Sequence, residues 1–190
     1  MLGVILCGGK SSRMGTDKGL LTEGDKRWSQ IALEKLSSLP LQCVVSINQL
    51  QLDAYSSFFS NDQLVLDKDE LKAGGPLLGL LSVHSRFPSE DLFVIACDMP
   101  KMELNALREI SYQQMQFPDF EAYVFSDGVH IEPLCGIYTA TGWKKILSAL
   151  KENKLQKQSM IHTLSLLNTK YLLMSDEWRP YFQNRNTLTD

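Results

Sequence analysis

Short, apolar runs rich in β-branched residues recur along the first half of the chain. They occupy Gly3–Leu6, Cys43–Ile47, Leu64–Leu66 and Leu92–Ala96, and they are nearly continuous rather than alternating with polar residues. Such runs are typical of strands that are covered on both faces. The pattern therefore predicts the buried strands of a parallel sheet.

Segments with helical spacing separate these runs. Apolar positions three and four residues apart share one face of a helix, and strands that alternate with helices predict a parallel sheet with right-handed crossovers. The three stripes are Trp28, Ile31, Ala32, Lys35, Leu36 and Leu39, with the stem of Lys35 at the edge; then Leu77, Leu80, Leu81, His84 and Phe87; then Leu104, Leu107 and Ile110 within Glu103–Gln116.

The second half of the chain predicts a mixed sheet. Strands are expected over Glu121–Phe125 and Leu134–Tyr138, on either side of the turn-like segment Ser126–Gly128. A connection this short indicates a hairpin, so one strand should run antiparallel. The remaining expected elements are helices over Ala140–Lys151 and Ser159–Leu167 and a late strand over Tyr171–Met174.

Length and composition are those of an ordinary globular protein. The 190 residues are 44% hydrophobic and 22% charged, which suits one large domain over residues 1–190. The net charge of −3 argues against a nucleic-acid binder, which normally carries a basic face. A small polyanion is still compatible with this charge, because a few lysines and backbone amides can form a local positive pocket.

The cysteines and the N-terminus indicate a cytoplasmic protein. Cys7, Cys43, Cys97 and Cys135 include no C-x-x-C pair, so neither a zinc site nor a disulfide framework is expected. The first apolar run has no basic residue before it and is far shorter than the roughly 20 residues of a membrane span. We expect neither membrane association nor export.

The first predicted strand runs directly into a glycine-rich segment, Cys7–Lys18, with the sequence CGGKSSRMGTDK. A loop at this place lies at the carboxyl end of the strands, where open α/β sheets bind ligands. Its glycines let backbone amides approach a phosphate chain, and Arg13 with Lys10 or Lys18 supplies positive charge. The spacing matches neither the P-loop nor the dinucleotide fingerprint. The alternative interpretation is a surface loop whose glycines only make turns.

The whole string Leu6–Lys18 resembles the signature of the molybdenum cofactor guanylyltransferase family, LAGGxSxRMGxDK, and departs from it only at Cys7, where the family has alanine. Three further segments resemble family motifs in the expected order: GPLLG at Gly75–Gly79, CDMP at Cys97–Pro100 and NRNT at Asn184–Thr187. The resemblance therefore spans nearly the whole chain.

This resemblance implies a single-domain, Rossmann-like nucleotidyltransferase fold, with a mostly parallel mixed sheet and helices on both faces. The implied reaction is the Mg²⁺-dependent transfer of GMP from GTP to molybdopterin that carries molybdenum. The acceptor is a phosphate that is ionised at neutral pH, so no general base is demanded. Transient contacts with molybdenum-insertion proteins and molybdoenzymes are implied as well.

The resemblance also assigns the site. Asp98 follows a predicted strand, where a carboxylate can hold Mg²⁺ against triphosphate oxygens, although an aspartate before a proline can also cap a turn. Asp67 follows another strand and is preferred over the nearby Asp69. Asn48 follows a third and offers a base edge both a donor and an acceptor, unless it only shapes a turn. The full set is Arg13, Lys18 and Asp98 for catalysis; Leu6, Cys7, Gly8, Gly9, Lys18, Asn48, Asp67 and Asp98 for GTP; Asp98 for the metal; and Gly75, Pro76, Asn184 and Asn186 on the molybdopterin side.

Two other functions remain open from the sequence. A sister enzyme would use CTP or another phosphate acceptor, but Gly9 favours guanine, because cytidylyl relatives tend to have AAG in the loop. A protein of a different class would bind a nucleotide or cofactor on the same fold without catalysis. Lys18 and Asp98 argue against such a protein, since a binder has no need of a metal-holding aspartate.

Overall fold

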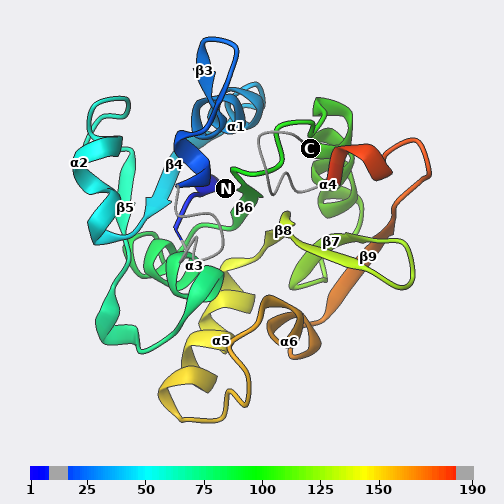
Figure 1. The fold of residues 1–190 in the computed structure, drawn as a ribbon. Coiled ribbons are helices and arrows are strands. Elements are labelled where there is room, and N and C mark those ends of the chain that lie inside the picture. The colour runs from blue at the N-terminus through cyan, green and yellow to red at the C-terminus, as the bar shows by residue number, and fades with distance from the viewer. Residues whose placement is uncertain (9–16, 183–190) are drawn as a thin grey trace.

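The computed structural model describes residues 1–8 and 17–182, and these form a seven-stranded mixed sheet with helices on both faces (Figure 1). The strand order is β5-β4-β1-β6-β8-β7-β9. The strands are β1 (Leu2–Leu6), β4 (Gln42–Ile47), β5 (Leu64–Leu66), β6 (Leu92–Ala96), β7 (Ala122–Ser126), β8 (Ile131–Tyr138) and β9 (Thr169–Leu173).

Helices cover each face because neighbouring residues of a strand point to opposite sides of the sheet. On β1, Ile5 belongs to a core cluster with residues of α1 (Trp28–Ser37) and α4 (Leu104–Gln116). Val4 and Leu6 belong to a second cluster with α3 (Gly75–Arg86), α5 (Ala140–Lys151) and α6 (Met160–Ser165). Figure 1 shows the first two helices on one side of the sheet and the other three on the opposite side. The predicted continuous apolar runs thus contribute to two cores at once.

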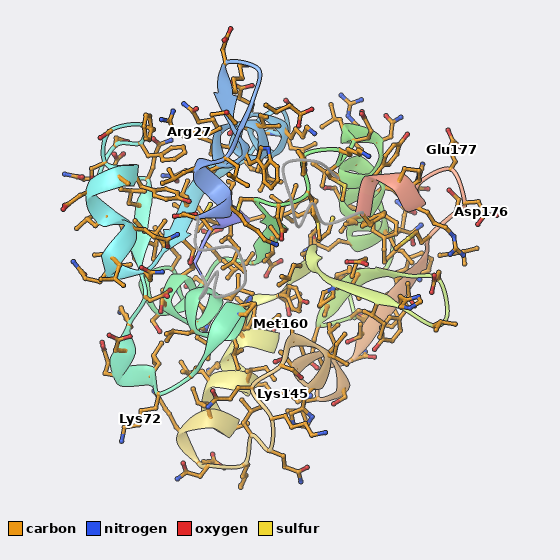
Figure 2. The ribbon with its side chains drawn as sticks, in the orientation of Figure 1. Arg27, Lys72, Lys145, Met160, Asp176 and Glu177 are labelled. Atoms are coloured by element: carbon orange, nitrogen blue, oxygen red, sulfur yellow. The ribbon has the colours of Figure 1, made fainter. Side chains whose placement is uncertain are left out.

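The connections contain several short elements. Two of them, β2 (Thr22–Glu23) and β3 (Lys26–Arg27), form a two-stranded hairpin, which the apolar pattern does not predict because each strand is only two residues long. Arg27, labelled in Figure 2, places its guanidinium 3.5 Å from the centre of the Phe58 ring. The hairpin therefore contacts the segment that follows α2 (Leu52–Tyr55). The remaining short elements are η1 (Lys18–Leu20), η2 (Gln49–Gln51), η3 (Asp69–Leu71) and η4 (Arg179–Phe182).

Strand direction agrees with the predicted mixed sheet. β1 pairs in parallel with β4 and β6, and β4 pairs in parallel with β5. β8 pairs antiparallel with both β6 and β7, while β7 pairs in parallel with β9. The expected hairpin between the strands at 121–125 and 134–138 is therefore confirmed, and β8 is the strand that opposes its neighbours.

Some predicted bounds were wrong. The helix expected over Ser159–Leu167 covers Met160–Ser165, because Ser159 is the N-cap, whose side chain accepts a hydrogen bond from the His162 amide. The late strand starts two residues earlier than expected, at Thr169, where β7 supplies its partners.

All four cysteines are buried and free, as expected from their spacing. Among the described residues, no helix is long and apolar enough to cross a membrane.

Candidate active site

Four parallel strands end at the same edge of the sheet, and each is followed by a glycine or by a polar residue. Gly8 follows β1, Asn48 follows β4, Asp67 follows β5 and Asp98 follows β6. From β1 the chain passes to β4 and β5 on one side and then crosses back from β5 to β6 on the other side of β1, so the edge lies at a topological switch point of the kind where open α/β sheets bind ligands.

Gly8 brings the backbone close to two of the predicted nucleotide residues. A side-chain carbon at this position would lie 3.5 Å from Asp67 Oδ2 and 3.8 Å from the backbone nitrogen of Asn48. The Gly8 amide itself donates to the Ser46 carbonyl at 3.0 Å, which continues the ladder between β1 and β4. Gly8, Asn48 and Asp67 therefore form one contiguous group.

The Asp67 carboxyl has a pKa well above that of an exposed aspartate. Burial raises its pKa from 3.8 to about 6, and the negative charge of Asp69 adds to the shift. Its Oδ1 is buried without a hydrogen-bond partner among the residues described by the structure. Asp69 itself is exposed in η3. Of the two candidate aspartates, Asp67 is the one that lies beside Gly8.

Asn48 combines the two roles considered from the sequence. Its Oδ1 accepts from the Leu50 amide at 2.9 Å and caps η2. Its backbone nitrogen donates to Gln51 Oε1 at 2.9 Å, which completes a capping box. In residues 1–8 and 17–182 we find no acceptor for its side-chain amide nitrogen, which therefore retains its donor capacity.

Lys18 and Asp98 form an ion pair across the site. Lys18 Nζ lies 2.8 Å from Asp98 Oδ2, and the two side chains are 24% and 18% exposed. The pair joins the first residue of η1 to the turn after β6. It places a cation and an anion together at the sheet edge, both within reach of solvent.

Asp17, directly before Lys18, is anchored from three sides. Its Oδ1 accepts from the Gly19 amide at 2.9 Å and from the hydroxyl of the fully buried Tyr55 at 3.1 Å. Its Oδ2 accepts from Gln51 Nε2 at 2.5 Å. Sequence reasoning assigned no role to Gln51 or to Tyr55. The N-x-x-Q spacing was a signal for the capping box, but no local pattern indicates the contact with Asp17.

The described residues fit a metal ion that is held together with substrate phosphates. They contain no cluster of three or more histidine, cysteine, aspartate or glutamate side chains. Mg²⁺ is commonly bound by one or two carboxylates together with phosphate oxygens and water. The partly exposed Asp98, whose Oδ2 pairs with Lys18, is suited to supply such a carboxylate.

The other predicted residues divide into two groups. Gly75 and Pro76 form the first turn of α3, and Gly75 has a φ of +57°, which glycine adopts readily. One turn later Gly79 packs on the strand ends, since a side-chain carbon there would lie 2.7 Å from Ser46 Oγ. The remaining predicted residues, Gly9, Lys10, Arg13, Asn184 and Asn186, lie outside the described residues.

A mostly parallel sheet whose first strand leads into a glycine-rich segment, with a lysine–aspartate pair at the adjoining strand ends, defines a nucleotidyltransferase. Residues 3–166 match the family model of the MobA-like NTP transferase domain. A molybdenum cofactor guanylyltransferase from Campylobacter jejuni is 33% identical over 174 residues, which cover 92% of this chain and 85% of that protein. The chain belongs to this family, and it is a nucleotidyltransferase of molybdenum cofactor biosynthesis.

Solved structures show the same fold. The molybdopterin-guanine dinucleotide biosynthesis protein A of Archaeoglobus fulgidus aligns with a TM-score of 0.79 at 23% identity, covering 100% of this chain and 94% of that one. A more distant protein from Mycobacterium tuberculosis, solved in complex with manganese, aligns with a TM-score of 0.58 at 20% identity, covering 91% and 87% of the two chains.

Proposed function

We propose that the protein transfers GMP from GTP to molybdopterin carrying molybdenum, with release of pyrophosphate. The observation that carries this proposal is the contiguous group of Gly8, Asn48 and Asp67, which lies at the same sheet edge as the Lys18–Asp98 pair. The first group suits a base and its nucleoside, and the second suits phosphates. The named relatives support the choice of guanine and molybdopterin.

Guanine matches the hydrogen-bonding groups beside Gly8. The Asn48 amide nitrogen can donate to O6, and the Asp67 carboxylate can accept from N1–H and N2–H. Adenine reverses the polarity at position 6 and would leave these groups unpaired at a cost of roughly 1–3 kcal/mol for each lost contact. Cytosine would leave part of the purine site empty. The protein should therefore prefer GTP, assisted by backbone contacts around Leu6 and Cys7.

The chemical step is an in-line displacement at the α-phosphorus. An ionised oxygen of the molybdopterin phosphate forms the new P–O bond, and the bond to the bridging oxygen of the β-phosphate breaks. That oxygen keeps the electron pair and leaves as pyrophosphate, so no proton has to move. Lys18 offsets charge around the α-phosphate, and Arg13 with the amides of the glycine-rich segment holds the triphosphate.

Asp98 would hold the divalent cation, which we propose to be Mg²⁺. When bound, such an ion neutralises triphosphate charge and favours departure of pyrophosphate. Gly75, Pro76, Asn184 and Asn186 are proposed for the molybdopterin side. The four free, buried cysteines fit a reducing compartment, so we place the reaction in the cytoplasm, where molybdenum-insertion proteins and molybdoenzymes would be transient partners.

Calorimetry with GTP, CTP, ATP and UTP in the presence of Mg²⁺ tests the base, and product analysis tests the acceptor. We expect tight binding of GTP alone, and formation of pyrophosphate and a guanine dinucleotide only when molybdopterin and Mg²⁺ are both added. Equal binding of CTP and GTP would remove the guanine assignment but leave the nucleotidyltransferase class intact.

A further inference from the structure

One side-chain amide joins three parts of the candidate site that are far apart in the sequence. Gln51 Nε2 donates to the Cys7 carbonyl at 3.0 Å and to Asp17 Oδ2 at 2.5 Å. Gln51 Oε1 accepts from the Asn48 backbone nitrogen at 2.9 Å. Both N–H groups of the amide and its oxygen are thus engaged.

Two of these contacts lie at the two ends of the glycine-rich segment. Cys7 is its first residue, and Asp17 immediately precedes Lys18, its last residue. Both ends of the segment are therefore bonded to one nitrogen atom, which belongs to a residue 34 positions away from Asp17 and 44 away from Cys7. The third contact holds the backbone of Asn48.

A purely local role does not account for this arrangement. The bond from Asn48 to Gln51 Oε1 is a capping box, and by itself it would serve only to start η2. A cap needs no partner for the amide nitrogen. Here that nitrogen reaches out of η2 to the end of β1 and to an aspartate that is itself fixed by the buried Tyr55 hydroxyl.

From this geometry we propose that Gln51 is a positioning residue that sets the spacing between the two ends of the glycine-rich segment and couples them to the base site. It acts through Asp17 on Lys18 and through the backbone on Asn48, and it touches no reacting atom. The inference rests on the proposed function, since it concerns how GTP is aligned for transfer.

Gln51→Glu is the discriminating variant. A glutamate oxygen can still accept from the Asn48 amide, so the capping box is kept. The other carboxylate oxygen then faces the Cys7 carbonyl and the Asp17 carboxylate. In the wild-type protein the Gln51 nitrogen donates to both of these acceptors, whereas in the variant three acceptors lie together and repel one another. Misplacement of a reacting group by about 1 Å can cost on the order of a hundredfold in rate.

We expect Gln51→Glu to lower kcat with GTP on the order of ten- to a hundredfold, and to weaken GTP binding in calorimetry severalfold. The matched control is Gln49→Ala, an exposed residue of the same short helix, which should behave as wild type. The double variant Asp17→Asn/Gln51→Glu restores a donor–acceptor pair between positions 17 and 51, and it should recover part of the loss relative to Gln51→Glu.

Three results would overturn the inference. The first is a Gln51→Glu protein with wild-type GTP affinity and kcat. The second is a lowered melting temperature as its only defect, which would make Gln51 a turn cap and nothing more. The third is a double variant that is no better than the single one. Failure of the wild-type protein to bind GTP would instead refute the proposed function, so the two failures are distinguishable.

Discussion

Lys18 is the residue on which the proposed chemistry depends most directly. Its ammonium already lies at the strand ends, 2.8 Å from Asp98 Oδ2, and its side chain fills no core position. Lys18→Ala should therefore fold normally but lose roughly 2–4 kcal/mol of transition-state stabilisation, a factor of tens to several hundred in kcat.

Lys26→Ala is the matched control for this variant, because Lys26 is also a paired surface lysine but belongs to the β2–β3 hairpin. It should retain full activity. A Lys18→Ala protein that turns over at nearly the wild-type rate with saturating GTP would exclude Lys18 from the mechanism.

Asp67 should make stability depend on pH. The pKa of its carboxyl is about 6 in the folded protein and near 3.8 when exposed, so the folded state binds the proton more tightly. The free energy of unfolding therefore falls as pH rises from about 4 to about 6, and the loss is complete above that range. Asp67→Asn should stabilise the protein by about 1 kcal/mol at pH 8, because the group is only partly buried, and by nothing at pH 4.

The same ionisation should govern base selection. In the proposed site the ionised Asp67 would accept hydrogen bonds from guanine, so the ratio of GTP to ATP affinity should rise between pH 5 and pH 7. Taking the ratio cancels ionisation of the phosphates, which both nucleotides share. Asp67→Asn should give a low ratio at every pH; a wild-type ratio that does not change with pH would contradict this role.

At the scale of the element, Asn48 both caps η2 and faces the proposed base site, and two substitutions separate these functions. Serine retains a good N-cap acceptor, whereas alanine does not and should cost about 1 kcal/mol of stability. Neither retains the amide nitrogen. Asn48→Ser should therefore lose preference for GTP over ATP in calorimetry while melting like wild type, and Asn48→Ala should lose both. Retained GTP preference in both variants would show that Asn48 only shapes the turn.

Close packing of α3 on the strand ends depends on Gly79. An added methyl group would lie 2.7 Å from Ser46 Oγ and 2.9 Å from Leu6 Cδ1. Gly79→Ala should therefore lower the free energy of unfolding by about 1–3 kcal/mol through overpacking. Denaturant unfolding measures this directly.

Ser46→Ala supplies the control for that prediction. The Ser46 hydroxyl is buried without a hydrogen-bond partner in the described part of the chain, so its removal should be neutral or stabilising. The double variant Ser46→Ala/Gly79→Ala should lose less free energy of unfolding than the two single variants lose together. Strict additivity would mean that the Ser46 contact does not limit the approach of α3.

The sequence predicted most elements because their patterns are local. Ala140–Lys151 was predicted with the bounds that the structure has, since Thr139 caps the helix and the apolar stripe runs its full length. β8 begins three residues before the strand expected over Leu134–Tyr138 and includes Pro133, a residue type that is disfavoured in the middle of a sheet. The strand tolerates this proline where pairing with β6 has ended at Cys135 and the pairing with β7 is interrupted by a bulge.

At the scale of the whole molecule, the positions of Asn48, Asp67 and Asp98 followed from one rule, that parallel strands end at the same edge. The sequence could not show that Gln51 reaches Cys7 and Asp17, because contacts 34 and 44 residues apart leave no periodic signal. The hairpin of β2 and β3 was not predicted either. Its contacts are local, but its strands are too short to carry a pattern of apolar and polar residues.

The position of β1 inside the sheet, between β4 and β6, has a consequence for the order in which the protein can fold on the ribosome. This strand obtains its first neighbour only with β4, at residues 42–47, and its second only with β6, at residues 92–96. The chain must therefore have left the exit tunnel as far as Ala96 before β1 is enclosed on both sides. Because the proposed nucleotide site includes the ends of these strands, a nascent chain that stops short of β6 lacks part of that site and should not gain the stabilisation that bound nucleotide would give.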